Sequence, residues 1–304
     1  MPLLNRVGNA RAVLIAGPTA SGKSALALDL AETTAKAGRA ALVVNADAMQ
    51  VYEGLRLLTA RPSGADETRA PHRLYGHVPA ATRYSVGAWL QDVQPVLHEA
   101  NATGALLILV GGTGLYFKAA TEGLVATPDI PAAVRRKWAD RLACEGAAAL
   151  HACLSSTDAE AAAVIRPGDA SRIVRALEVL EATGRPIGAW RTDRAAPPLL
   201  PPGAGLRIVV EPERDALYRR IEARFDNMVA QGALEEVEAL LKRDFDPALP
   251  AMKAIGVREF AAVLQDRSGL AEAVEAAKRE TRRYAKRQMT WFRNQFRAWE
   301  RLRT

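Results

Sequence analysis

The sequence has few cysteines and no long apolar run, and both shortages exclude classes of protein. Cys144 and Cys153 are the only cysteines among 304 residues, too few for a disulfide framework or a cysteine metal cluster. No stretch reaches the roughly 18 apolar residues of a membrane helix. Residues 1–11 lack the apolar segment of a secretory signal. We therefore expect a cytoplasmic protein with no membrane partner.

The net positive charge of the chain lies entirely in the C-terminal segment. From Lys278 to Thr304 there are ten Lys and Arg against two Glu, a net charge of +8, compared with +7 for the whole chain. Such a concentration is typical of proteins that bind a polyanion. Phe292, Phe296 and Trp299 recur there at helical spacing, and we interpret them as core packing with the charges on the opposite face.

Apolar runs of strand length alternate with helical patterns in the first half of the chain. Strands are predicted at residues 12–16, 40–45, 106–110 and 206–210, and the first helix at 24–37. Continuous apolar strands separated by helices indicate an α/β fold, in which helices cover both faces of a parallel sheet.

A stretch without strand signals interrupts this pattern. Two helices are predicted within it, at residues 133–152 and 170–182, and proline-rich segments lie at both of its ends. We therefore predict a core formed by residues 1–122 and 197–304, interrupted by an all-helical insertion at 123–196. Beyond Arg214 the chain is predicted to be mostly helical.

The first predicted turn carries a phosphate-binding motif. Gly17-Pro18-Thr19-Ala20-Ser21-Gly22-Lys23-Ser24 matches G-x-x-x-x-G-K-[ST], after a strand and before a helix. This context predicts a P-loop NTPase-like core, in which backbone N–H groups and the helix N-terminus bind a polyphosphate. Lys23 would neutralise a phosphate and Ser24 would ligate Mg²⁺.

The acidic residue expected for nucleotide hydrolysis is missing from its usual place. The strand at 106–110 ends in Gly111-Gly112-Thr113-Gly114, whereas an acid, Asp47, follows the strand at 40–45. This favours a diphosphate that is a leaving group or cargo. Asp47 is either a general base near the ligand or a helix cap or turn residue. Thr113 either contacts the ligand or is a solvated turn residue.

Arginines after the second and fourth strands are further candidates. Arg220 and Arg224 share a helix face, so one of them either reaches the phosphates or pairs with Glu222 or Asp226. Scattered arginines are less informative, and we interpret Arg56, Arg61, Arg69 and Arg73 as solvated surface.

Seven ordered motifs resemble those of the tRNA dimethylallyltransferases, also called tRNA isopentenyltransferases. They are GPTASGKS (17–24), NADAMQVY (45–52), TARP (59–62), PHRLYGHV (71–78), VGGTGLYF (110–117), SRIVRALEV (171–179) and RRYAKRQMTWFR (282–293). The resemblance implies transfer of a dimethylallyl group from dimethylallyl diphosphate, with Mg²⁺, to the exocyclic N6 amine of the adenine next to the anticodon of tRNA.

The resemblance also implies roles for individual residues. Asp47 would accept the amine proton, Thr113 would contact the same site, and Arg224 would bind the diphosphate with residues 17–24. The positions that match tRNA-contacting segments are Asp47, Ala48, Met49, Gln50, Thr113, Arg135, Ser171, Arg172, Ile173, Val174, Arg175, Lys253, Ala254, Ile255, Gly256, Val257 and Arg258.

The chain departs from the family pattern in three places. Ala48 replaces a serine that many members have after the aspartate, and Leu58 and Arg61 stand where many have Gly and Lys. The sequence ends soon after the Trp-Phe-Arg motif. The alternatives are a P-loop kinase that uses ATP, a non-catalytic RNA-binding protein, and a transferase that acts on free adenine nucleotides. We expect a monomer.

Overall fold

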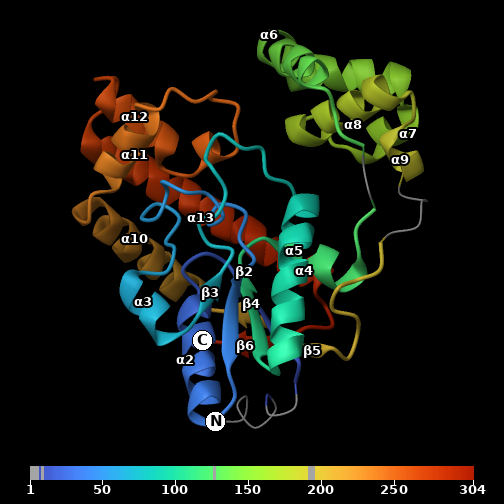
Figure 1. Cartoon of the computed structure of the whole chain (residues 1–304). Helices are drawn as coiled ribbons and strands as arrows, with labels where there is room; N and C mark the ends of the chain where they lie inside the picture. The colour runs from blue at the N-terminus through green and yellow to red at the C-terminus, as the bar shows by residue number, and fades with distance from the viewer. Residues whose placement is uncertain (1–6, 8–9, 126–127, 191–195) are drawn as a thin grey trace. The chain divides into compact units, whose positions relative to one another are not determined.

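The computed structural model describes residues 7, 10–125, 128–190 and 196–304 of the chain (Figure 1). They form two compact units, one from Met1–Glu122 with Leu199–Thr304 and the other from Gly123–Pro198. The sequence predicted the second junction two residues earlier, between 196 and 197. Within the described ranges, every helix is too short or too polar to cross a membrane.

The larger unit is built on a six-stranded sheet in which every neighbouring pair is parallel. The order is β3-β2-β4-β1-β5-β6. The strands are β1 (Ala12–Ala16), β2 (Ala41–Asn45), β3 (His72–Arg73), β4 (Leu106–Gly111), β5 (Gly205–Glu211) and β6 (Glu300–Arg303). The four predicted strands are confirmed to within one residue at each end. β3 and β6 were not predicted, because they are short edge strands without an apolar run.

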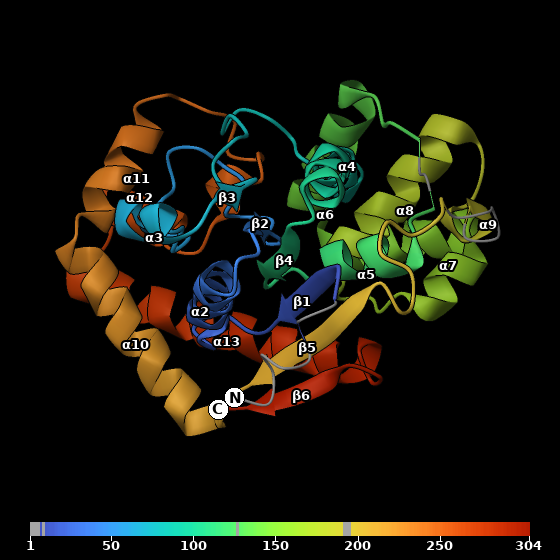
Figure 2. The same ribbon diagram turned by 60° about the horizontal axis from the view of Figure 1, so that its bottom comes forward.

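Helices cover both faces of this sheet, as predicted (Figure 2). Alternate strand residues point to opposite faces, so Leu14 packs in the cluster beneath α4 and α5, whereas Val13 packs against α2. The helices of this unit are α2 (Lys23–Lys36), α3 (Gly64–Arg69), α4 (Val86–Thr103), α5 (Gly114–Glu122), α10 (Arg214–Ala230), α11 (Ala233–Leu241), α12 (Val257–Leu264) and α13 (Leu270–Gln295), with a 3₁₀ turn at Ala251–Lys253.

The aromatic stripe near the C-terminus is confirmed as core packing. Phe292, Phe296 and Trp299 are at most 7% exposed, and the Phe296 and Trp299 rings stack with centroids 4.0 Å apart. However, α13 ends at Gln295, so a turn rather than a continued helix carries Trp299 into the core. The chain then adds β6 to the sheet beside β5.

The smaller unit is all-helical. Its helices are α6 (Ala132–Thr157), α7 (Ala159–Val164), α8 (Ala170–Thr183) and α9 (Ile187–Trp190), and they include both predicted helices. Gly146 has a φ of 80°, which interrupts the helical backbone of α6. Leu150, Leu154 and Ile173 form the centre of this unit's core.

Candidate functional site

The turn between β1 and α2 presents unpaired backbone donors. Gly22 adopts a left-handed conformation before Lys23, the first residue of α2. The start of α2 has no side-chain cap and no acidic residue in its first turn. The first N–H groups of a helix have no partner within the helix and lie at its positive end. This turn therefore has the backbone features of an anion site.

Lys23 lies beside this helix start with its charge only partly compensated. Its Nζ donates a 3.1 Å hydrogen bond to the Pro18 carbonyl. Burial lowers the pKa of Lys23 to about 8, and the nearby charge of Asp47 partly opposes this shift. An anion bound here would favour the charged ammonium.

Two arginines of α10 reach the same turn. Arg224 donates from Nη2 to Thr19 Oγ1, and Arg220 Nη1 lies 3.5 Å from the Ser21 carbonyl oxygen. Burial lowers the pKa of Arg224, although the guanidinium keeps its charge at neutral pH. The spacing of four residues therefore places both side chains on the helix face next to the phosphate-binding turn.

The alternative, in which Glu222 or Asp226 neutralises these arginines, is not what the structure shows. Glu222 accepts a 2.7 Å contact from Arg282, and Asp226 lies 2.7 Å from Lys278 Nζ. Glu222 and Asp226 thus both bind cations of α13, which lies beside α10 (Figure 1). These pairs also neutralise part of the basic C-terminal segment that the sequence suggested as a polyanion-binding surface.

Asp47 is held in a turn just after β2. Its Oδ1 accepts a 3.0 Å hydrogen bond from the Met49 N–H, and its own N–H donates to Asn45 Oδ1 at 2.8 Å. The turn-residue interpretation of Asp47 is therefore correct. It is also compatible with a chemical role, because the turn occupies Oδ1 and leaves Oδ2 available on the side of Gly112.

Asn45, which the sequence analysis did not single out, fixes this turn. The side chain is fully buried, and Nδ2 donates to the carbonyls of Asp47 and Leu74 at 2.9 and 3.0 Å. The Asn45 carbonyl in turn accepts from Trp89 Nε1 at 2.9 Å. The sequence signal for Asn45 was a polar residue at the end of an apolar strand, because a buried amide needs hydrogen-bond partners.

Thr113 connects the end of β4 to the turn that carries Asp47. Its N–H donates to the Ala46 carbonyl at 3.2 Å, and its Oγ1 accepts from the Ala48 N–H at 2.8 Å. A Cβ on Gly111 would lie 2.0 Å from the Ala46 oxygen, so only glycine allows this close approach. The hydroxyl proton of Thr113 is left free to donate toward the cavity.

Asp47, Thr113 and Arg224 line one cavity of about 420 Å³. Its walls combine predicted site residues with residues of α10 and α13. They are Thr19, Asp47, Ala48, Met49, Leu58, Thr59, Thr113, Ile221, Arg224, Phe225, Met228, Lys253, Ala254, Ile255, Thr281, Tyr284 and Arg287. The sequence missed Tyr284 and Arg287, since nothing local in α13 distinguishes cavity-lining residues from the other polar positions. Burial and the charge of Asp47 raise the pKa of Tyr284.

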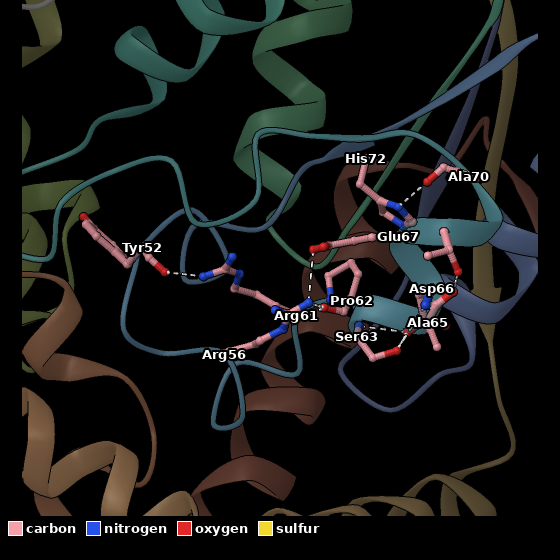
Figure 3. Close-up of polar contacts among 11 residues, drawn as sticks. Tyr52, Arg56, Arg61, Pro62, Ser63, Ala65, Asp66, Glu67, Ala70 and His72 are labelled. Carbon is pink, nitrogen blue, oxygen red and sulfur yellow. Dashed lines mark hydrogen bonds and ion pairs between the residues drawn. The ribbon is translucent and has the colours of Figure 1, made fainter.

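Ser24 lies in a second cavity of about 280 Å³, together with Arg61 and Tyr75. Arg61 donates from Nη1 to the Tyr52 carbonyl at 3.2 Å (Figure 3), and its Nε is buried without a partner among the described residues. Burial lowers the pKa of Arg61. The expectation of solvated surface was therefore wrong for Arg61, whose guanidinium packs against Gly76.

The other three arginines of that group form ion pairs at the surface. Arg56 contacts Glu67 at 3.2 Å and the Pro62 carbonyl (Figure 3), and Arg73 contacts Glu99 at 2.8 Å. Arg69 lies 2.5 Å from Glu32. Exposed pairs of this kind stabilise a fold only weakly, so we assign no further role to them.

Several positions that match tRNA-contacting segments do not present their side chains to solvent. Ile173, Ala254 and Val257 are at most 5% exposed and pack in cores, although Ala254 also lines the cavity, and their contact with tRNA stays a prediction. Gln50 uses its amide to hold the Thr59 carbonyl at 2.8 Å.

The remaining positions divide between the two units. Lys253 and Ile255 line the cavity, and the side chain of Arg258 is 85% exposed. In the helical unit, Arg172 pairs with Asp169 at 2.7 Å, while Ser171 is exposed and Arg135 is half-buried. Gly256, Val174 and Arg175 complete the set, and Arg175 pairs with Glu178 at 3.8 Å.

Comparisons with known proteins agree with this arrangement. The family model described as IPP transferase matches residues 50–295. The chain is 54% identical over 284 residues to the tRNA dimethylallyltransferase of Chelativorans sp. (strain BNC1), covering 93% of this chain and 95% of that protein. It is 55% identical to that of Rhodopseudomonas palustris (strain BisA53), covering 94% and 86%.

Solved structures show the same similarity. The tRNA isopentenylpyrophosphate transferase of Bacillus halodurans has a TM-score of 0.67 at 32% identity, covering 97% of this chain and 90% of that one. A eukaryotic dimethylallyltransferase, described as acting on tRNA, has a TM-score of 0.73 at 26% identity. That similarity covers 93% of this chain and 70% of the other.

Proposed function

Because the chain belongs to the IPP transferase family, we propose that it is a tRNA dimethylallyltransferase. The reaction forms a bond between C1 of the dimethylallyl group and the exocyclic N6 of the adenine on the 3′ side of the tRNA anticodon. The bond from C1 to the diphosphate oxygen breaks, the N6 proton passes to Asp47, and diphosphate leaves. The observation that carries the proposal is that Asp47 and Arg224 line one cavity next to the phosphate-binding turn.

On the donor side, the protein supplies positive charge where the leaving group gains negative charge. Lys23 and Arg224 flank Thr19, and the N–H groups that open α2 have no side-chain cap. Preorganised donors of this kind stabilise charge that develops in the transition state, and they are more effective where water is excluded. The same groups would bind the product diphosphate.

On the acceptor side, Asp47 Oδ2 is the proposed proton acceptor and Thr113 the proposed hydrogen-bond donor. An adenine amine is a weak nucleophile, because its lone pair is delocalised into the ring. A positioned carboxylate contributes about 10²–10⁴-fold to such a transfer. The reacting base must leave its stack to enter the cavity, which costs little in a single-stranded loop.

We propose Mg²⁺ as the metal for this reaction. The residues present fit an ion that the protein and the substrate would bind together. Among the described residues, no group of three or more His, Cys, Asp or Glu could hold a metal alone. Mg²⁺ often takes one or two protein oxygens and completes its shell with phosphates and water. The Ser24 hydroxyl at the exposed start of α2 would supply such an oxygen. The ion would neutralise charge on the leaving diphosphate.

The proposed partners are tRNA and dimethylallyl diphosphate, and we propose a monomer in the cytoplasm. The cysteines are unpaired, in keeping with a reducing compartment. We propose that the helical unit, with Arg135, Arg172 and Arg175, holds the anticodon arm.

The kinase alternative is the weaker one. A P-loop kinase would need a carboxylate beyond the central strand to hold the metal of ATP. In this chain β4 leads into Gly112, Thr113 and Gly114, and the turn packs against Ala46 without an acidic side chain. The carboxylate at the site follows β2 instead, and the turn at Met49 occupies one of its two oxygens.

The test is prenylation of RNA by the purified chain. We expect the protein with Mg²⁺ and dimethylallyl diphosphate to add one five-carbon group to a tRNA with adenine next to the anticodon, as shown by mass spectrometry. The same tRNA with guanine at that position is the control and should stay unmodified. Modification of AMP or ATP in place of tRNA would overturn the proposed acceptor, and turnover of ATP alone would overturn the proposed chemistry.

A further inference from the structure

Gln288 of α13 joins the two loops that form the site. Its side-chain Oε1 accepts a hydrogen bond from the Thr19 N–H, and its Nε2 donates one to the Gly112 carbonyl, each at 2.9 Å. The residue is only 6% exposed. One buried amide therefore spans the phosphate-binding turn after β1 and the turn after β4.

A carboxamide satisfies both contacts, whereas an ionised carboxylate does not. A carboxylate would accept from Thr19 but would have no proton for the Gly112 carbonyl. It would also add a second negative charge near Asp47, because a Cβ on Gly112 would lie 2.3 Å from Gln288 Nε2 and 2.9 Å from Asp47 Oδ2. A lysine or methionine would leave the Thr19 N–H without an acceptor.

Through these contacts, Gln288 completes a continuous path from the donor side to the acceptor side. On one side, Thr19 is held through its N–H by Gln288 and through its hydroxyl by Arg224. On the other side, Gly112 leads into Thr113, whose Oγ1 accepts from the Ala48 N–H next to Asp47. Gln288 thus bridges the two halves of the site, which the pairing of β1 with β4 also holds together.

The same contacts determine which backbone donors remain for the diphosphate. Gln288 uses the Thr19 N–H, and the Pro18 carbonyl accepts from the Ser21 N–H at 3.2 Å. Neither the Thr19 N–H nor the Ser21 N–H is therefore free to bind an anion in this arrangement. The binding therefore falls to the N–H groups at the start of α2 and to Lys23 and Arg224.

We propose that Gln288 is a positioning residue, and this inference rests on the proposed function. It holds the diphosphate-binding turn at the distance from Asp47 at which the allylic carbon can reach the amine. Gln288 is not among the residues that line the cavity of Asp47 and Arg224. Its loss should therefore lower kcat rather than weaken diphosphate binding, since a small error in alignment reduces the rate much more than the affinity.

The experiment compares Gln288→Met with wild type and with Gln295→Met. Gln295 lies on the same helix and accepts from Lys118 Nζ at 2.9 Å, on an exposed surface. We expect Gln288→Met to lower kcat for tRNA prenylation about 10–100-fold. Its affinity for inorganic pyrophosphate with Mg²⁺, measured by calorimetry, should stay within about threefold. Gln295→Met should match wild type in both measurements.

A second variant separates positioning from a general loss of structure. In Gln288→Glu, the introduced carboxyl group can accept from Thr19 and donate to Gly112 only when it is protonated. The ratio of its kcat to the wild-type kcat should therefore rise as the pH falls from 8 to 6. The ratio is measured at pH values at which circular dichroism shows both proteins to be folded, because a role in folding alone then predicts a ratio that does not vary with pH.

The outcomes are distinct from those of the proposed function. An inactive wild type would contradict the proposed function itself. An active wild type with an unchanged kcat in Gln288→Met, or with pyrophosphate binding lost in parallel with kcat, would overturn the positioning role. A pH-independent ratio for Gln288→Glu would overturn it as well.

Discussion

The Asn45 side chain accepts a 2.8 Å hydrogen bond from the Asp47 N–H and returns one of 2.9 Å to the Asp47 carbonyl. This reciprocal contact holds the carboxylate in a fixed turn at the end of β2. Because Asn45 is fully buried, no water can replace either bond. The position of the proposed base therefore depends on a residue that does not line the cavity.

Asn45→Ala should lower the free energy of unfolding. It leaves the Asp47 N–H and the Leu74 carbonyl without partners, and each buried unpaired group costs about 1–3 kcal/mol. We expect a loss of about 2–4 kcal/mol in urea denaturation. Asn101→Ala, on the exposed surface of α4, is the control and should change the stability by less than about 0.5 kcal/mol. Equal effects of the two changes would contradict this account.

Asp47→Asn should abolish most of the turnover and leave donor binding intact. The new amide still has an oxygen for the Met49 N–H, so the turn persists while the proton acceptor is lost. We expect kcat to fall about 10²–10⁴-fold. Pyrophosphate affinity, measured by calorimetry, should not weaken.

Asp246 provides the matched control for this change. It accepts from the Ala248 N–H at 2.7 Å in the same kind of turn but does not line the cavity. Asp246→Asn should leave kcat unchanged. Loss of pyrophosphate binding in Asp47→Asn would mean that Asp47 has a structural or metal-binding role instead.

Arg224→Met should raise KM for dimethylallyl diphosphate and lower kcat. A hydrogen bond from a charged donor contributes about 1.5–3 kcal/mol, so kcat/KM should fall about 10–100-fold. Arg224→Lys should recover part of this loss, because it keeps the charge without the guanidinium geometry. Arg282→Met, which removes the partner of Glu222, is the control. If both variants lost the same activity, general loss of positive charge would be the cause.

The affinity for pyrophosphate should fall above pH 8. Burial lowers the pKa of Lys23 from 10.5 to about 8, so the ammonium that attracts the anion is lost above that pH. The unfolded chain keeps this proton to higher pH than the folded chain. The ligand-free protein therefore gains stability from Lys23 as the pH rises from 8 toward 10.5, while binding weakens.

Lys23→Arg isolates this effect from the titration of pyrophosphate itself. Its guanidinium stays charged throughout the range, so the ratio of wild-type to variant affinity should fall as the pH rises past 8. Calorimetric titrations at pH 7, 8 and 9 measure this ratio. A constant ratio would show that Lys23 does not change its charge in this range.

Arg135→Gln tests the proposed role of the helical unit in tRNA binding. Removing one phosphate contact should weaken tRNA binding and reduce the slope of log K against log salt concentration by about 1. KM for dimethylallyl diphosphate should not change. Arg141→Gln on the same helix is the control, because Arg141 already binds Glu145 at 2.6 and 2.8 Å. Identical slopes for wild type and Arg135→Gln would exclude the contact.

The sequence alone predicted the features that local patterns determine. The apolar strands and the glycine-rich turn can be recognised from local residue patterns. Parallel pairing of the strands then brings Asp47 and Thr113 to the same edge of the sheet. β6 has no apolar run, and it exists only because α13 and the turn at Phe296 return the chain to β5. Tyr284 and Gln288 reach the site because α13 packs against loops that lie 170 residues or more away in the sequence. A local motif does not predict such packing.

The bond between Thr19 and Gln288 joins residues 269 positions apart in the chain. During synthesis from the N-terminus, the glycine-rich turn emerges first, and its partner emerges only after a further 269 residues have been made. A nascent chain can therefore fold its first strands long before its phosphate-binding turn acquires the final alignment. The enzyme is expected to become active only once α13 has been made and packs on the turn.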